Sequence, residues 1–147
     1  MVSQLACDLS DRIAAVGAVG GIRFPGPCSA ARPFPIVAFH GTGDEVNPYD
    51  GGGQPYWGTG VEPAITGWAQ HNACDTRSDA QFSPSVLEIS HGGAGCGNEV
   101  VLYRIDGFGH SWPGVLGSVA AGGSGVASEV TANQLLWRFF DKHPLAL

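Results

Sequence analysis

The sequence predicts an α/β fold with a mostly parallel sheet and flanking helices. Apolar runs of strand length alternate along the chain with segments whose apolar residues recur at helical spacing. The clearest strand is residues 35–40, a continuous apolar run up to His40 that is typical of a strand buried on both faces. The chain has 147 residues, enough for one domain with a sizeable core, so we expect a single domain over residues 1–147.

The first half of the chain is expected to form two helices and two buried strands. Residues 2–10 carry leucines one helical turn apart, which indicates a short helix. Residues 13–19 are small, apolar and β-branched, as in a buried strand, and residues 35–40 form the next strand. Residues 61–73 have apolar side chains at helical spacing and a proline in the first turn, where it is tolerated.

The second half is expected to add two strands and a last helix. Residues 86–90 alternate between apolar and polar side chains, and residues 99–105 form a longer apolar strand. The acidic residues Asp75 and Asp79 are interpreted as solvated loop charges. Ser128 is a plausible cap for the last helix, which we expect to end at residues 142–144.

Composition and charge exclude several classes of function. The net charge of −6 argues against nucleic acid as a partner, because a phosphate backbone requires a basic surface. No apolar run approaches the roughly 20 residues of a membrane span, and the N-terminal residues do not form a signal peptide. No Cys-x-x-Cys pair is present, so we expect no metal site, and no organic cofactor is implied.

The four cysteines have two interpretations. Pairing of nearest neighbours, Cys7 with Cys28 and Cys74 with Cys96, closes two loops of modest length and is the preferred arrangement. The alternative is four reduced, buried thiols. If the bridges form, the protein works outside the cytosol, because disulfides persist only in oxidising compartments.

Two predicted strands end in glycine-rich loops that each carry one ionisable residue. Asp44 follows the strand over 35–40, and His110 follows the strand over 99–105. An aspartate and an imidazole from neighbouring parallel strands can meet above the sheet edge, where the carboxylate fixes the imidazole tautomer. Taken singly, Asp44 could be a turn residue and His110 a packed loop histidine. His40, at the end of its strand, is interpreted as a structural residue that hydrogen-bonds the loop.

Four stretches resemble the polyhydroxybutyrate depolymerase/feruloyl esterase family of secreted α/β-hydrolases. They are SQLACDLSDRIAAVGAVGG, PFPIVAFHGTGDEVNPYDGG, VVLYRIDGFGHSWPG and LLWRFFDKHP, which occur in this order over nearly the whole chain. The resemblance implies that Asp44 is the acid and His110 the base of a catalytic triad. It also implies disulfides, secretion, the C-terminal part of an α/β-hydrolase fold, and carboxylic esters as substrates.

The sequence lacks the third member of that triad. An α/β-hydrolase carries its nucleophile in a Gly-x-Ser-x-Gly elbow that precedes the acid and the base, and no such elbow occurs here. Three explanations stay open: a fragment of a longer enzyme, a naturally shortened relative, or a missing half supplied by another chain. A signal peptide would then lie in the absent N-terminal part.

The leading hypothesis is a carboxylic-ester hydrolase that uses a Ser-His-Asp mechanism in its full-length form. The alternative is an inactive relative that binds esters or carbohydrate. Trp112, Tyr49 and Trp57 are candidate substrate-binding residues, because their rings could line an aromatic cleft. The sequence does not choose between polyester, feruloyl and acetyl substrates.

The resemblance also predicts self-association. In the family, the strand equivalent to residues 13–19 lies beside the strand that ends at the nucleophile, so here it would present an unpaired apolar edge. We therefore expect a homodimer that pairs or swaps this edge, or a chain with poor solubility. A complementing N-terminal half is the other possible partner.

Overall fold

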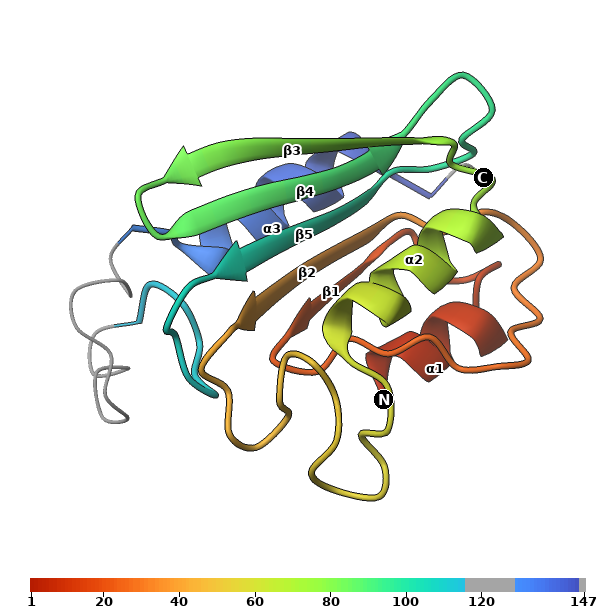
Figure 1. Cartoon of the computed structure of the whole chain (residues 1–147). Coiled ribbons are helices and arrows are strands. Elements are labelled where there is room, and N and C mark those ends of the chain that lie inside the picture. Colours follow the sequence, from red (N-terminus) through yellow and green to blue (C-terminus); the bar gives the residue numbers. More distant parts are fainter. Residues whose placement is uncertain (116–128, 146–147) are drawn as a thin grey trace.

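One five-stranded sheet with helices on both faces makes up the domain (Figure 1). The computed structural model describes residues 1–115 and 129–145. The strands within them are β1 (Val16–Val19), β2 (Ile36–Gly41), β3 (Thr76–Ser83), β4 (Val86–Gly92) and β5 (Val100–Ile105). The helices within them are α1 (Val2–Asp8), α2 (Val61–His71) and α3 (Ala132–Lys142).

The prediction of a mostly parallel sheet from an α/β-hydrolase is wrong. The strand order is β1-β2-β5-β4-β3, and only the β1–β2 and β2–β5 pairs are parallel. The β5–β4 and β4–β3 pairs are antiparallel, so the molecule is a small β-rich domain with a mixed sheet. The short connections explain the difference, because Pro84 and Ser85 alone separate β3 from β4, and a parallel pair needs a crossover of a dozen or more residues.

Strand β3 is an element that the sequence pattern did not predict. Its residues are exposed except for the half-buried Ser83, so the strand has no apolar period to reveal it. Asp79, expected in a loop, lies in this strand and receives a hydrogen bond from Arg77 at 2.8 Å. Pairing with β4 over the hairpin supplies the stability that the side chains of this edge strand do not.

Two hydrophobic clusters fill the space between the sheet and the helices. Helices α1 and α2 cover one face, where Trp68 and Ile65 of α2 pack against alternate residues of β1, β2 and β5. Helix α3 covers the other face, where Phe139 packs against the intervening residues of β2 and β5 (Figure 1). Helix α3 starts after Thr131, and Ser128, the expected cap, lies outside the described residues.

Both cysteine pairs are disulfide-bonded. Cys7 in α1 is joined to Cys28 in the loop between β1 and β2, and Cys74 after α2 is joined to Cys96 between β4 and β5. These are the nearest-neighbour pairs, and they close loops with sequence separations of 21 and 22. Two bridges in one domain fit an oxidising compartment.

Candidate active site

The loops after β2 and β5 lie side by side because these strands are parallel neighbours. Backbone hydrogen bonds join the loops, from the Thr42 amide to the Ile105 carbonyl at 2.9 Å and from the Gly43 amide to the Phe108 carbonyl at 3.0 Å. A Cβ on Gly41 would lie 1.9 Å from the Phe108 carbonyl oxygen, so only glycine permits this approach. Gly41 and Gly43 of the first loop therefore allow it to contact the backbone of the second loop.

Asp44 and His110 meet at this edge of the sheet. The Nδ1 atom of His110 lies 2.8 Å from Oδ2 of Asp44. The Asp44 side chain is fully buried, whereas the His110 side chain is 41% exposed. The carboxylate is therefore shielded from water, while Nε2, the other ring nitrogen of His110, is left for groups on the solvent side.

Asp44 is also a turn residue. Its Oδ1 accepts hydrogen bonds from the backbone amides of Val46 at 2.9 Å and Asn47 at 2.8 Å, which is an Asx turn. The two interpretations of Asp44 are thus compatible, because each carboxylate oxygen has its own partners. The turn fixes the carboxylate plane, and this directs Oδ2 at His110.

A second histidine lies against the same carboxylate. His40 is the residue before the last of β2, and its Nε2 lies 2.9 Å from the carbonyl oxygen of Asn47 and 3.3 Å from Oδ2 of Asp44. The ring hydrogen-bonds the loop, as expected for a structural residue, but it also contacts Asp44. Burial lowers the pKa of His40, and the neighbouring Asn47 carbonyl and Asp44 act in the opposite direction. His110 is a further, smaller cause that lowers this pKa.

Gly20, which directly follows β1, lies against both His110 and Asp44. Its φ is +63°, and a Cβ there would lie 3.1 Å from Nδ1 of His110 and 3.5 Å from Oδ2 of Asp44. Its carbonyl oxygen accepts a hydrogen bond from the side-chain amide of Asn47 at 2.7 Å. Three strand ends, those of β1, β2 and β5, therefore converge on the Asp44–His110 pair.

The structure separates the three predicted substrate-binding rings. Trp112 is 44% exposed and lines a cavity of about 220 Å³ together with His110, Gly20 and Ser111. Its indole Nε1 donates to Oδ1 of Asn133 in α3 at 2.8 Å, which fixes the ring beside the histidine. Trp112 is thus the predicted ring that adjoins the pair.

Tyr49 and Trp57 have other surroundings. The Tyr49 hydroxyl lies 3.2 Å from Oε1 of Glu62 in α2, and burial, with Glu62 beside it, raises the pKa of this phenol. Trp57 is 2% exposed and stacks on the ring of His40, with centroids 5.6 Å apart. Because Trp57 is enclosed in the core, it packs behind the pair rather than facing a ligand.

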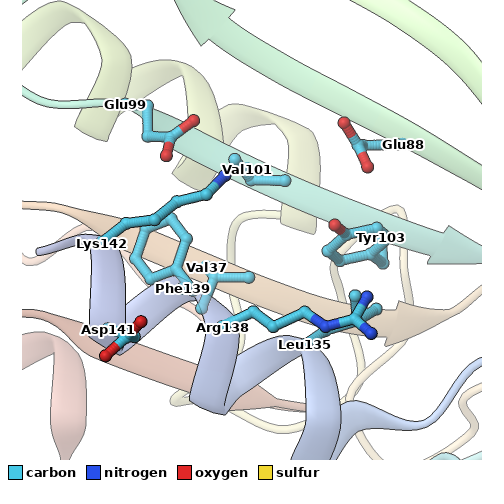
Figure 2. A pocket seen from close by; sticks show the side chains of 10 residues that line it. All are labelled: Val37, Glu88, Glu99, Val101, Tyr103, Leu135, Arg138, Phe139, Asp141 and Lys142. Atoms are coloured by element: carbon cyan, nitrogen blue, oxygen red, sulfur yellow. The ribbon is translucent and has the colours of Figure 1, made fainter.

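A larger cavity, of about 410 Å³, lies on the α3 face of the sheet. Figure 2 shows Glu88, Glu99 and Tyr103 from the strands opposite Arg138 and Lys142 from α3. None of the residues that the sequence singled out as catalytic or substrate-binding lines this cavity. The hydrogen-bonded Asp44–His110 pair, rather than cavity size, therefore identifies the candidate site.

The described residues suggest proton-transfer chemistry at this site. In residues 1–115 and 129–145, no group of three or more His, Cys, Asp or Glu side chains is arranged to hold a metal ion. Over the same ranges, no helix has the length and apolar character needed to cross a membrane. An imidazole held by a buried carboxylate at Nδ1 is suited to accept a proton at Nε2 and return it.

Sequence reasoning missed the parts played by His40 and Gly20. His40 precedes Asp44 by four residues at a strand end, and this spacing across a tight turn was the available signal. Gly20 ends an apolar strand that was predicted, yet nothing in the sequence near it shows that His110, far along the chain, lies above it. Such a contact depends on the strand order, which places β1 beside β2.

Comparison with known proteins links the chain to an esterase. It is 34% identical over 126 residues to feruloyl esterase B of Piromyces equi, a match that covers 76% of this chain and 23% of that protein. The chain thus spans less than a quarter of the length of this relative. No protein-family model matches the sequence. The chain is a distant, partial homologue of an esterase.

Proposed function

We propose that this chain carries the acid and the base of a carboxylic-ester hydrolase that acts by a Ser-His-Asp mechanism. The observation that carries the proposal is the 2.8 Å contact between Oδ2 of buried Asp44 and Nδ1 of half-exposed His110. The partial match to a feruloyl esterase supports esters as the substrate class. The nucleophilic serine would come from outside the 147 residues, either from the same polypeptide or from a second chain.

In this mechanism the serine hydroxyl oxygen attacks the ester carbonyl carbon while Nε2 of His110 accepts the hydroxyl proton. Collapse of the tetrahedral intermediate breaks the bond to the leaving alcohol, which takes the proton from Nε2. Water then repeats the sequence on the acyl-enzyme and releases the acid. Asp44 holds the Nδ1–H tautomer throughout and stabilises the positive charge that forms on the imidazole.

Trp112 supports an aromatic acyl group as the preferred substrate. The exposed part of its indole lies in the cavity that His110 lines, so a feruloyl ring could pack against it. The two disulfides support secretion, because disulfides persist in oxidising compartments. A secreted esterase would meet plant-derived or polymeric esters outside the cell. Feruloyl esters are our first choice, and hydroxyalkanoate polyesters and acetyl esters serve as comparisons.

The test is hydrolysis of methyl ferulate and p-nitrophenyl acetate by the natural protein expressed from its complete gene. We expect turnover, and we expect Asp44→Asn and His110→Ala each to lower kcat by about 10³- to 10⁴-fold, as loss of a triad member does. Asp50→Asn is the matched control, because Asp50 is an exposed carboxylate in the same loop. Full activity in His110→Ala would contradict the proposal.

The 147-residue chain by itself tests whether the nucleophile lies outside these residues. It should hydrolyse neither ester above background, because it would lack the nucleophile. Turnover that His110→Ala abolishes would show that the nucleophile lies within the chain. Binding of methyl ferulate by the natural protein without turnover would favour a binding module over an enzyme.

A further inference from the structure

His40 is buried in the core, where a polar ring atom without a hydrogen-bond partner is destabilising. Its side chain is fully buried between Trp57, which stacks on it, and Tyr49, whose ring centroid lies 6.0 Å away. Its Nδ1 is buried and has no hydrogen-bond partner. An unpartnered buried polar atom is destabilising, so packing alone would favour an apolar ring at this position. Any favourable contribution of the imidazole must therefore come from its other ring nitrogen, Nε2.

The surroundings define which nitrogen carries the proton. Nε2 faces two acceptors, the Asn47 carbonyl oxygen at 2.9 Å and Oδ2 of Asp44 at 3.3 Å. An unprotonated Nε2 would place a lone pair against both oxygens, whereas an Nε2–H donates to the Asn47 carbonyl and presents the positive end of the N–H dipole near Asp44. A proton on Nδ1 would be buried without an acceptor. The ring is thus the neutral Nε2–H tautomer, and burial, which lowers its pKa, favours the same neutral form.

We propose that His40 is a positioning residue that holds Oδ2 of Asp44 against Nδ1 of His110. This inference rests on the proposed function, in which Asp44 orients the catalytic base. The Nε2–H of His40 donates to the Asn47 carbonyl, while the Asn47 amide donates to Oδ1 of Asp44, so His40 and Asp44 hold the same turn. The His40 ring also lies 3.3 Å from Oδ2, on which His110 bonds, so Asp44 has one favoured orientation.

The neutrality of His40 matters to this role. A neutral N–H donor restrains the carboxylate without cancelling its charge, so the negative charge of Asp44 remains available to the imidazolium of His110. A cation at position 40 would instead pair with Asp44 and repel protonated His110. The ionisable groups that act on His40 are Asp44 and His110.

The test compares two amides at position 40 by imidazole NMR of the 147-residue chain, without substrate. In His40→Gln the side-chain amide reaches the place of Nε2 and can still donate to the Asn47 carbonyl beside Asp44. In His40→Asn it reaches only the place of Nδ1. We expect the wild type and His40→Gln to show a low-field His110 Nδ1–H resonance with the ¹⁵N shifts of that tautomer. In His40→Asn, as in Asp44→Asn, we expect this resonance to be lost through exchange with water.

A merely structural His40 gives a different result. In that case both amide variants would change stability while the His110 resonance stayed as in the wild type, and the inference would be overturned. His40→Phe is a third variant that preserves stacking on Trp57 and removes the donor, so loss of the resonance in this well-packed variant supports the positioning role. If the variants of the 147-residue chain do not fold, the same substitutions are compared by kinetics in the natural protein.

In the natural protein, His40→Asn should lower kcat about 10- to 100-fold with little change in KM, the effect expected when a group that orients the catalytic base is misplaced. His40→Gln should recover most of that loss. Equal kcat in the two variants would contradict the inference. The NMR result separates this proposal from the proposed function, because His40 can be shown to position Asp44 even if the natural protein hydrolyses no ester.

Discussion

The two oxygens of the Asp44 carboxylate have separate partners, and this division explains how one residue shapes a loop and orients an imidazole. Oδ1 closes the turn with the amides of Val46 and Asn47, and Oδ2 faces His110 and His40. The turn is local, whereas the imidazole contact joins residues 66 apart in sequence. The turn can therefore hold the carboxylate in place independently of the distant histidine. The position of each Asp44 oxygen is therefore fixed by its own hydrogen-bond partners.

Substitution of Gly20 should disturb the pair without touching its residues. Alanine at φ +63° is strained by about 1–2 kcal/mol, and its Cβ would lie 3.1 Å from Nδ1 of His110, closer than an ordinary contact. Gly52→Ala is the control, because Gly52 has φ +83° but nothing within 4 Å of the place where a Cβ would lie. We expect similar losses of unfolding free energy from strain, and a fall in esterase kcat of about tenfold only in Gly20→Ala. Equal kcat in the two variants would show that the contact has no effect on the site.

Acid should destabilise the fold through His40. Burial lowers its pKa below 6.5, so between that value and the folded-state pKa the unfolded chain binds more protons than the folded one. The free energy of unfolding therefore falls as the pH falls below about 6.5, by at most ~1.4 kcal/mol per pH unit for one proton. Burial lowers the pKa of His91 as well, so it contributes in the same direction.

The comparison of wild type with His40→Gln isolates this contribution. Urea unfolding near neutral pH and about two units below it should show a smaller acid-induced loss in the variant, which has no titrating group at position 40. His91→Gln measures the second contribution separately. Identical pH dependence in the wild type and His40→Gln would mean that His40 titrates alike in the folded and unfolded states.

At the scale of elements, the apolar periods predicted most of the helices and strands but not their directions. The buried runs at β2 and β5 were correctly placed, and their parallel pairing brings Asp44 and His110 together. The expectation of a mostly parallel sheet was wrong, because β4 is antiparallel to both of its neighbours. The seven residues 93–99 between β4 and β5 are too few for a parallel crossover. The spacing between the two predicted strands could therefore have indicated an antiparallel pair.

Strand β3 and the role of His40 could not be read from apolar patterning. Thr76 to Ser83 is almost wholly exposed, so its strand conformation depends on hydrogen bonds to β4 rather than on burial. His40 was interpreted as a structural residue that hydrogen-bonds the loop after its strand, whereas its contact with Asp44 depends on the turn in that loop. Both cases depend on pairing in three dimensions, which single-residue propensities do not encode.

The disulfides should supply a large part of the stability of this small domain. Cys74–Cys96 closes a loop with a sequence separation of 22, for which the chain-entropy model gives about 3 kcal/mol. Denaturant unfolding of Cys74→Ala/Cys96→Ala should show a loss of this size. Added reductant should lower the unfolding free energy of the wild type, and a wild type indifferent to reductant would contradict the prediction.

At the scale of the whole molecule, we expect self-association through the outer edge of β1, which has no partner strand within residues 1–115 and 129–145. The Val16 and Gly20 amides donate to β2, so the backbone groups of Gly17 and Val19, which alternate with them, point away from the sheet. Phe140 of α3 lies over Gly17, and the neighbouring Trp137 is 75% exposed. The unpaired edge thus continues into an exposed aromatic surface.

We expect sedimentation velocity to show a dimer of the 147-residue chain that forms through this edge. Trp137→Lys should shift the equilibrium toward monomer, because it places a charge in the aromatic surface beside β1. Phe82→Lys is a control, since Phe82 is an exposed aromatic residue on β3 at the opposite end of the sheet. A soluble monomer at all concentrations would contradict the prediction.

The central claim is that His110, held by Asp44, activates a serine for attack on an ester. It is tested most directly by the labelling rate of the natural protein with a fluorophosphonate, which reacts with activated serines. We predict rapid labelling of one serine outside the 147 residues, slowed about 10³-fold or more in His110→Ala. A labelling rate that is equal in the wild type and His110→Ala would contradict the claim.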